Sequence, residues 1–306
     1  MAKKRFSKVN IEISNICNLQ CSFCPEVVRA KGLMELALFE KIVGEVGPLT
    51  DQVCLHLMGD PLVHPKLDAF VELCARLDVP IFLVTNGVLL RERQAELLLH
   101  PIVRQVNFSL HSFPDNFPDR DPAPYLEKIF AFTERAFRER PDLYVNFRLW
   151  NLDAPDGDPK GTASRNRRML ELVNARFGAD ASPTALDVRR QKSFRVRDRR
   201  LYLHFDTEFV WPSLDLPLLG ETGTCHGLST HFGVLVDGTV VPCCLDKEGA
   251  IPLGNARETT IAEILDSPRA RKILRGFRER KLTEDLCRRC DYIERFRPLA
   301  KPVAIG

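Results

Sequence analysis

Polar and hydrophobic positions alternate along five stretches of the chain, which are residues 8–14, 52–58, 104–110, 143–150 and 201–206. In the last three of these stretches, Ser109, Arg148 and His204 take polar positions, and both neighbours of each are apolar. A period of two predicts strands with one polar face and one dry face. Residues 80–85 form a sixth strand candidate.

Helix candidates separate most of these strands. They cover residues 35–47, 65–78, 91–99, 124–139 and 161–177. Strands that alternate with helices predict parallel β/α units. A closed eight-stranded barrel fills its lumen with branched apolar side chains, so a polar lumen on six strands indicates an open barrel. The sequence therefore predicts an α/β fold with a partial (β/α)6 TIM-like barrel. An ordinary open sheet with an exposed polar face is the alternative.

The pattern changes near residue 207. Beyond this point lie one hairpin with an Asp237-Gly238 turn, two short helices at 259–266 and 268–280, and five of the ten cysteines. We predict a partial barrel over residues 1–206 and a small β-hairpin/α domain over residues 207–306.

Composition sets only broad limits. Hydrophobic residues make up 44% of the chain and charged residues 28%, which is typical of a globular protein with an ample core. The net charge of +3 indicates no particular partner. The basic start, residues 1–6, is not followed by an apolar signal segment, and no run of roughly eighteen apolar residues occurs. We expect a cytoplasmic protein that does not enter a membrane.

Three cysteines, Cys17, Cys21 and Cys24, follow the first predicted strand. The carboxyl ends of barrel strands are where β/α barrels carry their active sites. Three thiolates can hold three irons of a cubane iron–sulfur cluster, which normally takes four protein ligands, so one iron would stay open to a small molecule. A zinc site or a chance spacing is the alternative, although zinc usually takes four ligands in two pairs.

The run Cys17-x3-Cys21-x-Phe23-Cys24 resembles the signature of radical S-adenosylmethionine (SAM) enzymes. The resemblance implies that the three cysteines hold a catalytic [4Fe–4S] cluster, whose open iron binds SAM and whose electron cleaves it to a 5′-deoxyadenosyl radical. That radical abstracts hydrogen from a substrate carbon. Phe23 would shield the cluster and pack near the adenine. We expect a flavodoxin- or ferredoxin-type protein as electron donor.

Two further features resemble the SAM site of this family. Gly59, Asp60 and Pro61 resemble part of its Gly-Gly-Glu-Pro turn, whose backbone holds the SAM ammonium, although Met58 and Asp60 replace the usual glycine and glutamate.

Ser109 resembles the family's serine that hydrogen-bonds SAM. Arg148 would pair with the SAM carboxylate, because a guanidinium matches a carboxylate with two donors. A structural ion pair is the alternative for Arg148.

A second group of cysteines resembles the twitch domain, a shortened SPASM domain found behind radical SAM barrels. The resemblance implies four ligands for one auxiliary [4Fe–4S] cluster active in electron transfer: Cys225, Cys243, Cys287 and Cys290. A four-cysteine zinc site is the alternative. Cys244, next to Cys243, would point to the opposite face if both lie on a strand. It would then be a core residue or a hydrogen donor to a substrate radical.

These features predict a radical SAM enzyme that acts on a carbon of a polar small molecule or a peptide, by oxidation, epimerisation or cross-linking. His204 and Glu208 are candidate acid/base or substrate-binding residues at the junction of the two domains. The alternatives are a non-catalytic iron–sulfur or zinc accessory protein that binds RNA, or an RNA-modifying radical SAM enzyme. Seven positive charges and one negative charge within residues 189–200 are the only basic stretch that supports nucleic-acid binding, and a solvated face explains them as well.

Overall fold

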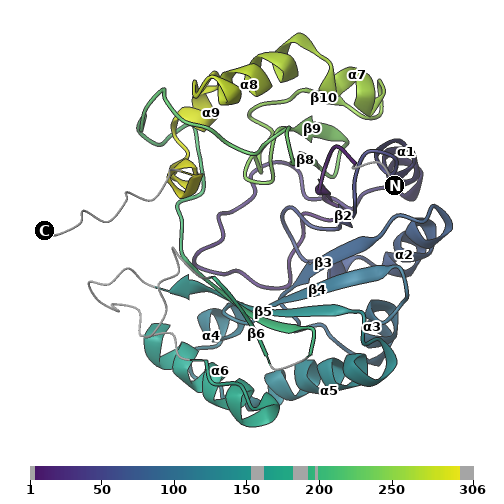
Figure 1. The fold of residues 1–306 in the computed structure, drawn as a ribbon, viewed down its shortest axis with the longest axis vertical. Coiled ribbons are helices and arrows are strands. Elements are labelled where there is room, and N and C mark those ends of the chain that lie inside the picture. Colours follow the sequence, from purple (N-terminus) through teal and green to yellow (C-terminus); the bar gives the residue numbers. More distant parts are fainter. Residues whose placement is uncertain (1–3, 153–161, 182–191, 197–198, 297–306) are drawn as a thin grey trace, which may run out of the picture.

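One continuous sheet organises the molecule (Figure 1). The computed structural model describes residues 4–152, 162–181, 192–196 and 199–296. The sheet has the strand order β10-β9-β8-β1-β2-β3-β4-β5-β7-β6. Six of its strands run parallel to one another: β1 (Lys8–Ile11), β2 (Val53–Cys54), β3 (Ile81–Thr85), β4 (Val103–Ser109), β5 (Tyr144–Leu152) and β7 (Leu201–Thr207).

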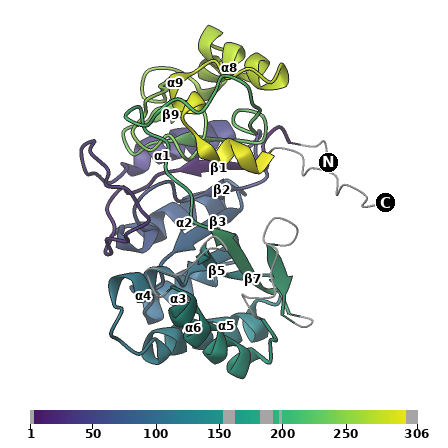
Figure 2. The same cartoon turned by 90° about the vertical axis from the view of Figure 1, so that its left-hand side faces the viewer.

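Helices cover the outer, apolar face of these six strands (Figures 1 and 2). Phe39 and Phe70, from two adjacent helices, are fully buried with ring centroids 4.6 Å apart. The covering helices are α1 (Leu36–Val46), α2 (Leu67–Arg76), α3 (Glu92–Leu98), α5 (Ala123–Glu139) and α6 (Thr162–Phe177). The predicted partial barrel is therefore confirmed.

Burial along the strands confirms the predicted faces. Every second residue of β5 is buried, including Phe147 and Leu149, whereas Arg148 between them lies on the lumen side. The strand expected over residues 52–58 is shorter than predicted. Only Val53 and Cys54 form ladder pairs with both β1 and β3, because the chain then turns toward the tight bend at Gly59.

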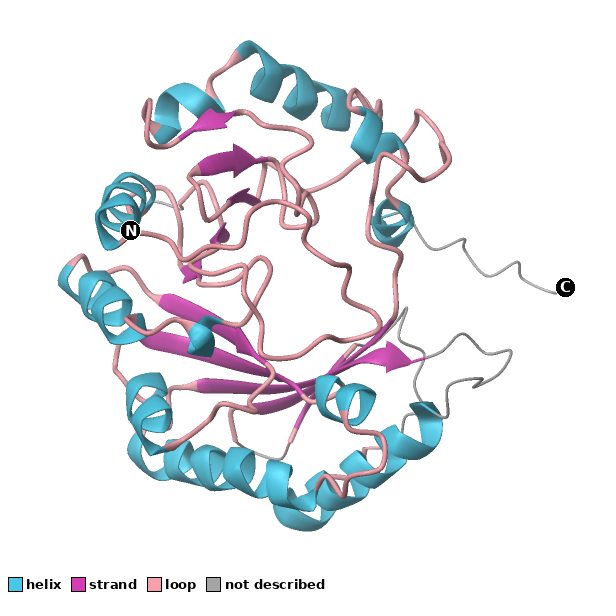
Figure 3. Ribbon diagram, turned by 180° about the vertical axis from the view of Figure 1, so that it is seen from behind, coloured by secondary structure: helices cyan, strands magenta, loops and turns pink. Residues whose placement is uncertain are grey.

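The carboxyl-terminal part of the chain extends the barrel sheet. Its first strand, β8 (His231–Val234), runs parallel to β1, with Val9 opposite Phe232. β9 (Thr239–Val241) and β10 (Gly254–Asn255) continue the sheet in antiparallel fashion. The helical elements of this part are α7 (Ile261–Leu265), α8 (Pro268–Arg278), α9 (Asp285–Arg288) and the 3₁₀ helix η3 (Asp291–Phe296), which lie together beyond β8–β10 (Figure 3). A boundary between residues 206 and 207 stays a prediction, because the sheet crosses it.

Six described elements were not expected: β10, α9 and η3 in the carboxyl-terminal part, and the 3₁₀ helix η1 (Pro61–Val63), helix α4 (Ser112–Asn116) and the edge strand β6 (Ser193–Arg195). β6 pairs antiparallel with β7. Proline and Asp-Asn in the α4 segment are typical of turns, so the sequence pattern did not predict this single helical turn. Among the described residues, no helix has both the length and the apolar character needed to cross a membrane.

Candidate functional site

The loop that carries the amino-terminal cysteines leaves β1 at its carboxyl end. Burial of the sulfurs raises the pKa of Cys17 to about 11 and that of Cys24 to about 12, and the neighbouring thiols of the motif add to both shifts. The three sulfurs therefore lie within electrostatic range of one another. Thiols with raised pKa values become thiolate ligands only when a cation such as iron compensates their charge.

Helix α4 supports this loop with direct hydrogen bonds. Asn116 Nδ2 donates to Cys21 Sγ at 3.2 Å, and Asn116 Oδ1 accepts from the Gln20 amide at 2.9 Å. The Asp115 carboxylate accepts from the amide and the hydroxyl of Ser22 at 2.6 and 2.7 Å. Sequence reasoning missed Asp115 and Asn116, because these contacts span more than ninety residues of chain.

The turn at Gly59 lies directly under the cysteine loop. Gly59 has φ of +72°, and a Cβ at this position would stand 2.6 Å from the carbonyl oxygens of both Ser14 and Ile16. The next amide, that of Asp60, donates to the Ile16 carbonyl at 3.0 Å. Only glycine fits this close approach of two backbones.

The Asp60 carboxylate has a role that its sequence position did not reveal. It is buried and accepts from the Leu62 amide at 2.9 Å, the Asn86 amide at 2.8 Å and the Thr85 hydroxyl. Asn86 in turn donates to the Asn18 side chain at 2.9 Å, within the cysteine loop. Asp60 therefore fixes the loop after β3 against the motif, and its carboxylate faces the protein.

A polar row crosses the lumen from β4 to β7. Ser109 lies opposite Arg148, and Arg148 lies opposite His204. The Arg148 guanidinium lies 4.3 Å from the centre of the Trp150 ring, and burial lowers its pKa to about 10. Its charge acts on Cys54 and on groups of the carboxyl-terminal part, and the pairing with SAM stays a prediction.

His204 is held in one tautomer. The Trp150 indole Nε1 donates to His204 Nδ1 at 2.7 Å, so Nδ1 must be the unprotonated nitrogen. Burial lowers the pKa of His204 to about 4, which keeps the ring neutral at pH 7. Its remaining nitrogen, Nε2, therefore carries hydrogen and faces the lumen as a donor.

The end of β7 and the residues after it include the other junction candidate, Glu208. Asp206, within β7, is buried in ion pairs with Lys192 at 2.9 Å and with Arg295 of η3 at 2.5 Å, so it ties the end of the barrel to the carboxyl-terminal part. Glu208 lies two residues further, and its backbone carbonyl lies 3.5 Å from an Arg295 guanidinium nitrogen. Its role as an acid or base stays a prediction.

The carboxyl-terminal cysteines also gather at one place. Burial is the larger cause of the raised pKa values of Cys243, Cys287 and Cys290. The nearby Cys225 thiol adds to each of these three shifts. The amide of Gly227 donates to Cys225 Sγ at 3.5 Å. Segments more than sixty residues apart in sequence thus present four thiols to one another.

Cys244 does not lie on a strand. β9 ends at Val241, so Cys243 and Cys244 occupy the bend that follows it, and the expectation of opposite strand faces is wrong. Cys244 packs against the small apolar cluster that contains Leu57 and Met58. Its charge also acts on Arg148, which places it at the edge of the lumen.

Cysteine thiols serve as ligands both in iron–sulfur clusters and in zinc sites. A four-cysteine zinc site needs all its sulfurs about 2.3 Å from one point. The cysteine ligands of an iron–sulfur cluster bind different irons, so their sulfurs spread over the faces of the cluster.

A network of charged residues connects the segments that follow the two cysteine groups. Fully buried Glu12, just beyond β1, accepts from Arg29 Nη2 at 2.5 Å and from the amides of Met58 and Val236 at 3.2 and 3.0 Å. Arg29 Nε donates to the carbonyl of Lys247 at 2.6 Å. Arg29 and two backbone amides thus enclose the Glu12 carboxylate.

Comparison with known protein families matches this geometry. The model for the radical SAM superfamily matches residues 11–154, and the model for the SPASM iron–sulfur cluster-binding domain matches residues 225–291. The chain belongs to the radical SAM superfamily. The SPASM match begins at Cys225 and ends one residue after Cys290, so it encloses the whole second cysteine group. The chain therefore has a radical SAM domain followed by a SPASM iron–sulfur cluster-binding domain.

Two curated relatives share parts of the sequence. The SAM-dependent 2-deoxy-scyllo-inosamine dehydrogenase of Niallia circulans is 29% identical over 31% of this chain and 41% of its own length. The GTP 3′,8-cyclase of Chlorobaculum tepidum is 26% identical over 66% of this chain and 56% of its own length. The chain thus matches about half the length of these relatives.

Solved structures share the fold across almost the whole chain. BtrN in complex with AdoMet and 2-DOIA has a TM-score of 0.55 at 17% identity, and the alignment covers 94% of both chains. Streptococcus suis SuiB bound to its precursor peptide SuiA has a TM-score of 0.60 at 16% identity, and the alignment covers 89% of this chain and 67% of SuiB. The anSMEcpe structure with bound AdoMet has a TM-score of 0.55 at 16% identity, over 87% of this chain and 78% of anSMEcpe.

Proposed function

We propose that this radical SAM enzyme oxidises a carbon centre of a polar small molecule, with one auxiliary [4Fe–4S] cluster as the electron acceptor. The polar row Ser109–Arg148–His204 carries the proposal, because it lies in the lumen between the two thiol groups. At one end, Phe23 of the cysteine loop contacts His111 with ring centroids 4.7 Å apart. At the other end, the charge of Arg148 acts on Cys244 and Tyr292 of the SPASM domain.

The residues divide into those that hold the cofactors and those that face the substrate. Cys17, Cys21 and Cys24 would hold the catalytic cluster, with Phe23 packed over it. The four SPASM cysteines described above would hold the auxiliary cluster. The backbone of Gly59, Asp60 and Pro61 would accept the SAM ammonium, and the Ser109 hydroxyl would donate to SAM. When bound, the first cluster and SAM supply the 5′-deoxyadenosyl radical of this superfamily.

The substrate reaction balances with the groups present. An alcohol carbon loses one hydrogen atom to the deoxyadenosyl group, then one proton from its hydroxyl and one electron, and a carbonyl results. The lone pair of His204 Nδ1 is occupied by Trp150, so His204 would donate to a substrate oxygen from Nε2. Glu208 is then the better candidate for the base. A flavodoxin- or ferredoxin-type protein would supply the electron that starts the reaction.

Two relatives favour a small molecule. One curated relative is a dehydrogenase, and the BtrN fold matches this chain over 94% of both lengths. The peptide-bound SuiB chain has about a third of its length outside the alignment. The SPASM match contains five cysteines, Cys244 among them, and the other four suffice for the single auxiliary cluster of the short twitch form.

Iron content and product analysis test the proposal. Anaerobically reconstituted protein should hold about eight irons per chain, four for each cluster. Cys17→Ala should abolish formation of 5′-deoxyadenosine. Cys287→Ala should still form 5′-deoxyadenosine and lose the oxidised product, because only the electron acceptor is removed. About four irons with one zinc per chain, or an oxidised product from Cys287→Ala at the normal rate, would overturn it.

A further inference from the structure

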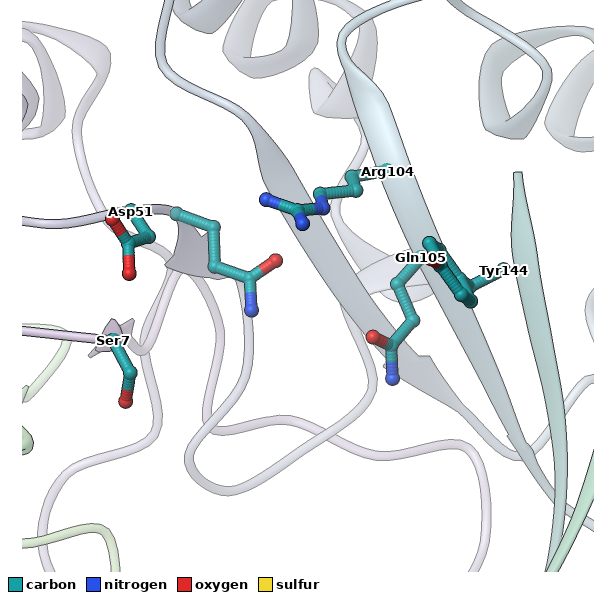
Figure 4. Close-up of a pocket in the computed structure, with 6 residues that line it drawn as sticks. Ser7, Asp51, Arg104, Gln105 and Tyr144 are labelled. Atoms are coloured by element: carbon teal, nitrogen blue, oxygen red, sulfur yellow. The ribbon is translucent and has the colours of Figure 1, made fainter. Parts of the chain in front are cut away.

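The lumen holds two adjoining cavities near the amino ends of the strands. The inner cavity has a volume of about 380 Å³ and the outer one about 240 Å³. Gln52, Gln105 and Tyr144 line both, so the two are continuous. Figure 4 shows the outer cavity with Ser7 and Asp51 on one side and Arg104, Gln105 and Tyr144 on the other.

The inner cavity is positively charged. Lys8 and Arg148 line it, and its lining includes no aspartate or glutamate. The Lys8 ammonium lies 5.8 Å from the centre of the Phe82 ring, which also lines this cavity. Arg148 makes no ion pair with a carboxylate among the described residues; aromatic rings and the side-chain amide of Asn107 surround it instead. Two cations without acidic partners favour an anionic occupant.

Uncharged polar groups complete the lining. The side-chain amide of Asn107 lies 2.9 Å from that of Gln105 and 2.7 Å from that of Asn146, so these amides form a connected row. Gln52 Oε1 is buried without a hydrogen-bond partner in the described part of the chain. A buried acceptor of this kind is costly unless a donor reaches it, and a ligand hydroxyl would satisfy it.

Carboxylates nearby do not offset this charge. Asp206, whose charge acts on His204, is held by Lys192 and Arg295. Asp51 lies at the outer cavity, where Arg104 also lines the wall. A cationic ligand would therefore meet Lys8 and Arg148 without a free carboxylate in the inner cavity.

We propose that the substrate is a small hydroxylated molecule with one anionic group, a carboxylate or a phosphate, that binds between Lys8 and Arg148. This inference rests on the proposed function in one respect, namely that the anion bound in the cavity is the substrate. Arg148 lies next to Ser109 and His204, and its carbonyl lies 3.1 Å from Nδ1 of His111, which contacts Phe23. His111 thus connects the strand that carries Arg148 to the cysteine loop.

Binding of four six-carbon probes tests this charge preference. Isothermal titration calorimetry of the reconstituted enzyme with SAM would compare D-glucuronate, D-glucose 6-phosphate, D-glucose and D-glucosamine. At least one anion should bind about tenfold more tightly than glucose, as expected for charge-assisted hydrogen bonds, and glucosamine should bind most weakly. The two anions distinguish a carboxylate site from a phosphate site.

Two neutral variants locate the site. Lys8→Gln should weaken anion binding about tenfold and leave glucose binding unchanged, and Arg148→Gln should weaken anion binding by a similar factor. Lys128→Gln, an exposed lysine on α5, is the matched control and should bind every probe like the wild type. Circular dichroism establishes that each variant folds. If Arg148→Gln does not fold, Lys8→Gln alone tests the site.

The proposal fails if neutral and anionic probes bind equally, if no anion binds at millimolar concentration, or if Lys8→Gln has no effect. An acidic peptide that binds more tightly than both small anions would also overturn it in favour of a peptide substrate. Formation of 5′-deoxyadenosine in the same samples is independent of these results, so the charge preference can fail while the proposed function stands.

Discussion

Arg29→Met would leave a charge buried without its partner. Glu12 has a fully buried side chain, and Arg29, with 16% of its side chain exposed, approaches both carboxylate oxygens, at 2.5 and 2.6 Å. Methionine keeps the length of the apolar stem and removes the guanidinium. The amides of Met58 and Val236 would remain as the only donors to the carboxylate that the structure shows.

The expected cost follows from the burial of the pair. Removal of one partner of a buried ion pair typically lowers the free energy of unfolding by about 3–5 kcal/mol. Burial already raises the pKa of Glu12, and Arg29 opposes that rise, so the variant should raise this pKa further. A carboxyl whose pKa is raised in the folded state loses stability as the pH rises from its unfolded pKa to its folded pKa. The deficit against the wild type should therefore increase as the pH rises above 4.5.

Denaturant unfolding under anaerobic conditions measures these changes. Arg76→Met is the matched control, because its ion pair with Glu40 at 2.8 Å is 63% and 55% exposed, and an exposed pair contributes at most about 1 kcal/mol. The double variant Glu12→Gln with Arg29→Met should recover part of the loss, since no charge remains buried. Equal losses for Arg29→Met and Arg76→Met, or a deficit that shrinks as the pH rises, would refute the reasoning.

Three further predictions concern the cysteine loop and the pH range. Gly59→Ala should lower the free energy of unfolding by at least about 2 kcal/mol, because φ is positive and a Cβ would clash with two carbonyls. Gly44→Ala, in α1 with open space around it, should instead raise this free energy by about 0.5–1 kcal/mol, and the same sign for both variants would contradict the argument. Asn116→Ala should make the reduction potential of the catalytic cluster more negative at unchanged iron content, as measured by redox titration with electron paramagnetic resonance, because a hydrogen bond to Cys21 Sγ is lost. Burial lowers the pKa of four histidines from 6.5 to about 4: His56, His111, His204 and His231. Their contribution to the free energy of unfolding should therefore be fully present above pH 6.5 and fall as the pH is lowered toward 4. Uptake of protons on unfolding at pH 5 checks this.

Features with a local period could be predicted from the sequence. The lumen positions of Ser109, Arg148 and His204 follow from alternation along single strands, and parallel pairing in register then brings them side by side. The helix ranges follow in the same way, since α5 was expected over residues 124–139 and covers Ala123–Glu139. The cysteine spacings belong to this class, because each motif lies within a few residues.

Contacts between distant segments could not be predicted. Glu12 has the spacing of a lumen residue, yet its partners Arg29 and Val236 lie 17 and 224 residues away. Asn116 supports Cys21 across 95 residues, from a helix whose composition is typical of a turn. No local period encodes such contacts, because they depend on how the strand ends meet in three dimensions.

The same long-range contacts bear on the proposed electron transfer. Glu248 follows the Cys243–Cys244 bend by a few residues and accepts from the amides of Val28 and Arg29, just beyond the amino-terminal cysteines. Lys247 donates to the Glu26 carbonyl at 2.9 Å. These bonds hold the segments next to the two proposed clusters against each other.

A loosened connection should therefore affect electron transfer between the clusters more than SAM cleavage. We expect Glu248→Ala to form 5′-deoxyadenosine at a near-normal rate and to yield less oxidised product for each 5′-deoxyadenosine, which chromatography of both compounds measures. Glu35→Ala is the matched control, because its exposed pair with Arg257 at 3.0 Å also joins the barrel to the SPASM domain. The control should keep the normal product ratio. An unchanged ratio in Glu248→Ala would show that this contact does not govern the electron-transfer step, since the remaining bonds from Lys247 and Arg29 would then suffice to fix the two segments.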